Sequence, residues 1–168
     1  MKKLLFPVVL LAVLLVLLIP MAMPAMAASI TSLASGNWSA AATWPTTNRS
    51  GTVTASNSSP TVTGSGTSFL SDVSPGTIIS TQSGTAIGTV LSVQSNTSLT
   101  LTSNASNTTS GTWRTNGPPG PGDAVTIASG QTITVDVNAS CASLTFPSGV
   151  SSSTNVNINS GITLSVSG

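Results

Sequence analysis

The stretch VTIASGQTITV at residues 125–135 is followed, 31 positions later, by the matching stretch VNINSGITLSV at residues 156–166. Four apolar positions, one serine, one glycine and one threonine coincide between the two copies. A strand, a glycine corner and a second strand that recur without helix signals are typical of a β-solenoid, whose coils stack on one another. We therefore predict two equivalent coils sharing one dry interior. A two-sheet sandwich is the alternative for this stretch.

The N-terminus has the layout of a secretory signal peptide. Lys2 and Lys3 precede an apolar run over residues 4–19, and the small-residue sequence Ala-Met-Ala ends at Ala27. A positive patch, an apolar stretch and an A-x-A site in this order predict a helical signal peptide over residues 1–27. The alternative is a retained membrane anchor, although the apolar run is short for a bilayer core of about 30 Å.

The chain after Ala27 is almost uncharged. Its charged side chains are two arginines and three aspartates, namely Arg49, Arg114, Asp72, Asp123 and Asp136. A surface with so few cations has no electrostatic means of binding nucleic acid, or a membrane once the leader is removed. Abundant Ser, Thr and Asn favour turns and strands, so the composition suits an all-β protein with neutral, hydrogen-bonding faces. Disorder of the whole chain is the alternative, but disordered chains rarely alternate so regularly.

Turn residues divide the chain after the leader into three parts. Residues 28–49 form an N-terminal β segment that contains two tryptophans. Residues 50–113 hold about six short β-branched stretches separated by glycine turns, which predicts a small β-barrel. Residues 114–168 open with a proline- and glycine-rich lead-in and continue into the predicted β-solenoid coils. The predicted fold class is all-β, a short β-solenoid or sandwich with an inserted small β-barrel.

Two sequence resemblances agree with this division. Gly36-Asn-Trp-Ser39 and Ala42-Thr-Trp44, together with residues 119–136, resemble the start of the right-handed β-helix of large secreted bacterial surface proteins. Residues 62–101 between them resemble a small all-β module of phage tail and tail-fibre proteins. The resemblances imply a β-helix with an inserted module at the cell surface, and neither implies a particular activity.

The residue types that most enzymes need are missing from the sequence. There is no histidine, glutamate or tyrosine, which excludes histidine-based triads and histidine metal sites. Asp72, Asp123 and Asp136 are the only side-chain carboxylates, and we interpret them as turn-capping and surface residues rather than as a glycosidase pair. We predict no catalytic, cofactor-binding or metal site and no enzymatic activity. Cys141, the only cysteine, is predicted to be a buried small apolar residue.

The three tryptophans are the candidate binding residues. Exposed indole faces stack on sugar rings, so Trp38, Trp44 and Trp113 are candidates for glycan stacking. The alternative is that they bury their indoles near the junction of the two modules, with each N–H hydrogen-bonded locally.

The sequence favours a non-catalytic extracellular structural or adhesive surface component. The alternatives are a carbohydrate-binding module and a self-assembling subunit of an extracellular fibre. The expected partners are accordingly surface polysaccharide, or copies of the chain joined through an open C-terminal sheet edge.

Overall fold

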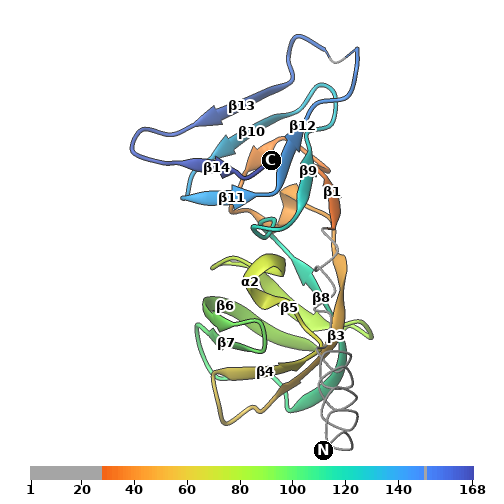
Figure 1. The fold of residues 1–168 in the computed structure, drawn as a ribbon, viewed down its shortest axis with the longest axis vertical. Helices are drawn as coiled ribbons and strands as arrows, with labels where there is room; N and C mark the ends of the chain where they lie inside the picture. Colours follow the sequence, from red (N-terminus) through yellow and green to blue (C-terminus); the bar gives the residue numbers. More distant parts are fainter. Residues whose placement is uncertain (1–27, 150) are drawn as a thin grey trace, which may run out of the picture.

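The computed structural model describes residues 28–149 and 151–168, so the predicted signal peptide lies outside the described residues. Nearly all regular structure in these ranges is β. The exceptions among the described residues are a 3-10 turn, η1 (Ala41–Thr43), and one short helix, α2 (Phe69–Asp72). Figure 1 shows two parts, an antiparallel barrel below and a group of parallel strands above. Neither described helix has the length and apolarity that crossing a membrane requires.

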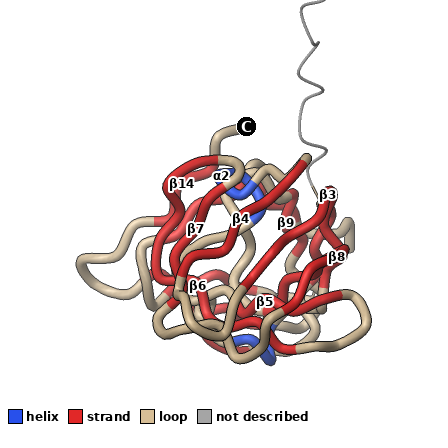
Figure 2. Tube along the Cα trace, turned by 90° about the horizontal axis from the view of Figure 1, so that it is seen from below, coloured by secondary structure: helices blue, strands red, loops and turns tan. Residues whose placement is uncertain are grey.

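Six antiparallel strands close the barrel in the order β3-β4-β7-β6-β5-β8. They are β3 (Thr47–Ala55), β4 (Thr61–Ser65), β5 (Ile78–Thr81), β6 (Ala86–Ser95), β7 (Ser98–Leu101) and β8 (Thr109–Asn116). Seen from below, these strands surround a common interior (Figure 2). Closure gives every strand two neighbours and leaves no sheet edge in the barrel. The prediction of a small β-barrel is therefore confirmed, and because β3 pairs with β8, the chain enters and leaves the barrel at one place.

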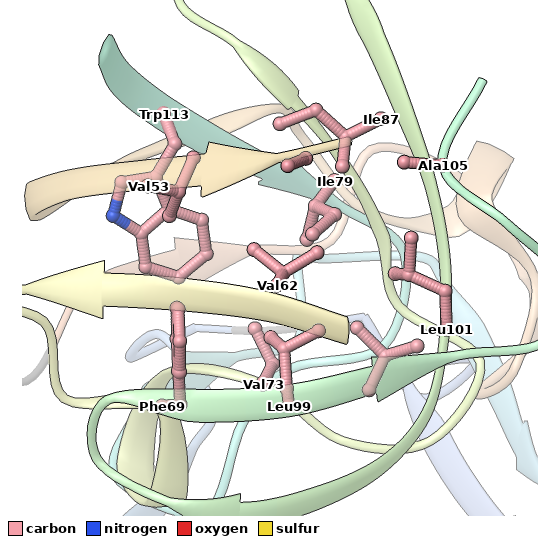
Figure 3. Close-up of a cluster of buried hydrophobic side chains, with 12 residues drawn as sticks. Val53, Val62, Phe69, Val73, Ile79, Ile87, Leu99, Leu101, Ala105 and Trp113 are labelled. Atoms are coloured by element: carbon pink, nitrogen blue, oxygen red, sulfur yellow. The ribbon is translucent and has the colours of Figure 1, made fainter. Parts of the chain in front are cut away.

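Alternating aliphatic residues fill the barrel interior. In β4, for example, Val62 is fully buried between Thr61 and Thr63, which face outward, as period-two alternation requires. The interior is closed by an edge-to-face pair, Phe69 from α2 and Trp113 from β8, with ring centroids 5.2 Å apart (Figure 3). Twelve buried residues make up this core, so the barrel has a packed interior rather than a channel.

The strands on either side of the barrel in sequence pair with each other in parallel. The first sheet contains β1 (Ser29–Thr31), β9 (Ala124–Thr126) and β12 (Ser143–Thr145); the second contains β2 (Gly36–Asn37), β10 (Thr132–Val135) and β13 (Asn155–Ile158). The third, in the described part of the chain, contains β11 (Ala139–Cys141) and β14 (Leu164–Val166). After the barrel, the chain visits the three sheets in the same order twice. We call these three sheets the parallel-strand body.

The predicted 31-residue register between the two copies is wrong. Val125 pairs with Leu144, and Ile133 pairs with Val156, so Val125 and Val156 lie in different sheets. The reason is that the connections between strands differ in length from one coil to the next. Stretches of alternating aliphatic and hydroxyl residues can therefore be aligned in several registers, and the sequence alone does not select one. Ile133 and Leu164 nevertheless belong to one apolar cluster, in which Ile133 is fully buried and Leu164 partly so.

Candidate functional site

The segment joining β8 to β9 lies directly against the barrel. Gly122 donates its backbone N–H to the Ser71 carbonyl oxygen at 2.8 Å. A Cβ atom at Gly120 would collide with the backbone of Ser71 and Asp72, so this close approach requires glycine. The Pro-Gly lead-in is thus a packed junction between the barrel and the parallel-strand body.

A buried ion pair crosses the same junction. Arg49 lies on β3 of the barrel, and Asp123 is the residue just before β9. The Arg49 guanidinium donates two hydrogen bonds to the Asp123 carboxylate, at 2.5 and 2.7 Å. The two side chains are 3% and 1% exposed. Arg49 also donates to the Thr115 hydroxyl at 3.0 Å, and Gly120 N–H donates to Asp123 at 2.7 Å. The paired carboxylate is thereby satisfied, as a buried charge requires.

Asp72 lies beside this pair, with its Oδ1 3.8 Å from Arg49 Nη1. Burial raises the pKa of Asp72 above its ordinary value, and the nearby Asp123 charge acts in the same direction, while Arg49 opposes both. The interpretation of Asp72 and Asp123 as surface residues is wrong, because they are 8% and 1% exposed. The sequence carries no local signal for the pair, because Arg49 directly precedes the predicted inserted module whereas Asp123 follows its end at residue 113 by ten positions.

Asp136 does act as a capping residue, although its partner is distant in sequence. Its carboxylate accepts the Ser39 backbone N–H at 3.0 Å and the Ser39 hydroxyl at 2.6 Å, which ties the segment after β2 to the end of β10. Burial alone would raise the pKa of Asp136, but the hydrogen bonds from Ser39 outweigh it and hold this pKa below its ordinary value.

All three candidate glycan-stacking tryptophans are buried. Trp38 and Trp44 are each 1% exposed and pack edge to face in the parallel-strand body, whereas Trp113 is 0% exposed inside the barrel. Trp44 Nε1 donates to the Trp38 carbonyl oxygen at 2.7 Å, and Trp113 Nε1 donates to that of Ser50 at 2.9 Å. A sugar ring has no indole face to stack on at these positions, so the glycan-stacking assignment is corrected to a packing role.

The remaining reactive side chain is also inaccessible. Cys141 is 1% exposed within the apolar cluster of the parallel-strand body, as predicted. Burial, together with the charge of Asp123, raises the pKa of its thiol and keeps it protonated. Over residues 28–149 and 151–168, no three metal-ligating acidic, histidine or cysteine side chains gather in one place.

A groove of about 540 Å³ opens between the barrel and the parallel-strand body. One wall comes from the barrel and the Pro-Gly segment, and the other from residues 38–39 and 137–140. The lining residues are Trp38, Ser39, Leu70, Val73, Ser74, Pro75, Gly76, Ser92, Val93, Pro118, Pro121, Val137, Asn138, Ala139 and Ser140. None of them carries a charge, so any occupant is recognised by shape, apolar contact and neutral hydrogen bonds.

Comparisons of the chain with protein-family models, with curated proteins and with solved structures return no match. Its function therefore has to be inferred from its own residues and their arrangement.

Proposed function

We propose that this chain is an exported, non-catalytic surface component that acts as a rigid structural or adhesive module. The observation that carries the proposal is the buried Arg49–Asp123 pair, which joins the barrel to the parallel-strand body at the point where the chain passes between them. Two parts held by a desolvated bidentate ion pair have a defined relative position, which a stalk or contact module needs. The charged side chains at this junction are engaged with one another rather than free for chemistry.

We further infer that the parallel-strand body is a short β-solenoid of the kind found in secreted bacterial surface proteins. Parallel strands that return to the same three sheets support this inference, because in a β-solenoid each coil adds one strand to every sheet. The barrel then occupies a corner of the first coil, in keeping with an inserted module.

Export and surface location are tested together. An epitope inserted between Asn57 and Ser58, both exposed in the turn after β3, labels the full chain in a bacterial host without touching the core. The proposal expects antibody to label intact cells and the recovered protein to begin at Ala28. Labelling only after the cells are permeabilised, with the leader still attached, contradicts export.

The adhesive half of the proposal is tested on the same cells. Attachment to protein-coated and polysaccharide-coated surfaces, and clumping of the cells, are compared with those of cells that lack the chain. Attachment or clumping above that control supports the adhesive role, and equal values contradict it. The three tryptophans that were the candidate sugar contacts for the carbohydrate-binding alternative are buried.

Self-assembly is the second candidate, and it rests on the last strands of the three sheets. Within the described part of the chain, β12, β13 and β14 each pair on one side only. Ile158 and Val166 on these strands are 51% and 47% exposed. Unpaired strands with apolar side chains are templates for adding another chain, so we propose that copies associate through this edge.

A further inference from the structure

Among the described residues, the third sheet of the parallel-strand body lacks a strand that the other two sheets possess. The first and second sheets each receive one strand from the segment before the barrel, namely β1 and β2. After β2 the chain turns into η1 and then enters the barrel, so it supplies no such strand beside β11. Within residues 28–149 and 151–168, sheet β11-β14 therefore has an open edge on the side where β1 and β2 lie in its neighbours.

The backbone of Ser140 faces this open edge. In a parallel pair, alternate residues direct both their N–H and C=O groups to the same neighbour. Ala139 N–H donates to Thr163 O at 2.9 Å and Cys141 O accepts Ser167 N–H at 3.2 Å, so these two residues face β14. Ser140 between them faces the other way, and neither its N–H nor its C=O has a hydrogen-bond partner among the described residues.

The uncharged groove lies along the same edge. Residues 137–140 form one of its walls, and Val73, Pro75 and Val93 of the barrel are part of the opposite wall. Its volume falls within the range of about 300–1,000 Å³ that is usual for ligand pockets. A segment lying here meets a free N–H and C=O on one side and apolar side chains on the other.

We propose that this groove binds an uncharged, extended peptide segment, which pairs with β11 as the missing third strand of its sheet. The free backbone groups of Ser140 recognise an extended backbone, and the apolar wall selects small aliphatic side chains. Adding a strand to an exposed sheet edge is a general mode of peptide recognition. A sugar fits less well, because the groove offers neither an exposed aromatic face nor a charged side chain. This proposal goes beyond the surface role and does not depend on export.

The test uses an N-acetylated, C-amidated peptide with the sequence of residues 159–168, because Leu164–Val166 within it already pairs in parallel with β11. Binding to the purified protein is measured by calorimetry, and exchange of the Ser140 amide hydrogen by NMR. We expect saturable binding and slower exchange of the Ser140 amide when the peptide is present. Absence of saturable binding overturns the proposal.

Two proline variants locate the site. Ser140→Pro removes the N–H that faces the groove and leaves the hydrogen bonds to β14 in place, so we expect affinity to fall about tenfold or more. Ser140→Ala retains the N–H and should bind like the unmodified protein. Val166→Pro removes a donor on the outer edge of β14, and it too should leave binding unchanged. If Val166→Pro abolishes binding while Ser140→Pro does not, the peptide adds to the outer edge and the groove proposal is overturned.

Discussion

At the scale of single residues, Arg49 and Asp123 show how strongly a fold with few charges depends on the ones it buries. The two side chains are 74 positions apart in the chain, so no local pattern predicts their pairing. Each would be an uncompensated buried charge if the other were removed. Such a charge lowers the free energy of unfolding by more than the loss of an ordinary surface hydrogen bond does.

We predict that Arg49→Gln lowers the free energy of unfolding by about 3–5 kcal/mol, because it leaves the buried Asp123 carboxylate without its partner. The control is Arg114→Gln, which alters the only other arginine after the leader. Arg114 is half-buried and donates a single hydrogen bond to Ser80 at 3.1 Å, so we expect a loss of about 1 kcal/mol. Urea unfolding of both variants measures the difference. Equal losses would show that the buried pair contributes no more than a surface contact.

The Ser39–Asp136 contact predicts a dependence of stability on pH. The folded pKa of Asp136 lies below its unfolded value of about 3.9, so the contact stabilises the protein above that pH and is lost as pH falls through the folded pKa. Asp136→Asn should therefore lower the free energy of unfolding at pH 7 by about 1 kcal/mol. The difference from the unmodified protein should shrink at pH 3. Urea titrations at both pH values check this, and a deficit that stays constant would contradict the assignment.

At the scale of elements, the Pro-Gly segment before β9 illustrates a role that composition suggests only in part. Its prolines and glycines predict a stiff lead-in, and the structure places it against Ser71 and Asp72 of the barrel. Glycine is required at position 120 because a Cβ atom would collide with the barrel backbone. Glycine is favoured at position 130 because the backbone there is left-handed. Gly130 has φ +79° and nothing within 4 Å of an added Cβ.

These two glycines make a matched pair of substitutions. Gly120→Ala forces the segment away from the barrel and should cost about 1–3 kcal/mol of unfolding free energy through overpacking. It should also speed amide exchange at Gly122, which bonds to Ser71. Gly130→Ala should cost about 1–2 kcal/mol from its left-handed backbone alone and leave exchange at Gly122 unchanged. Faster exchange at Gly122 in both variants, or in neither, would argue against a packed junction.

At the scale of the whole molecule, the unpaired strands β12, β13 and β14 determine whether copies associate. The free side of β13 can be blocked without disturbing its pairing with β10. Asn155 N–H donates to the carbonyl oxygen of Gln131, just before β10, and Asn159 N–H donates to that of Val135 in β10, so Ile158 N–H faces away from β10. Ile158→Pro removes that outward donor and an exposed apolar side chain together.

We expect the purified protein to form larger species as its concentration rises, and Ile158→Pro to remain monomeric at the same concentrations. Analytical ultracentrifugation measures both. Ser58→Pro, in the exposed turn after β3, is the control for a proline placed far from the edge. A monodisperse unmodified protein across the whole range would rule out assembly through this edge.

The sequence by itself determined the all-β class and the barrel. These properties follow from period-two alternation and glycine turns, which act over a few residues. Tertiary structure alone decided the coil register, the Arg49–Asp123 pair, the choice between buried and exposed tryptophans, and the groove beside β11. Each of these depends on which distant segments become neighbours, and that follows from corner lengths and from the close packing of the barrel against the parallel strands. Alternating Val, Ile, Thr and Ser residues are compatible with several such arrangements.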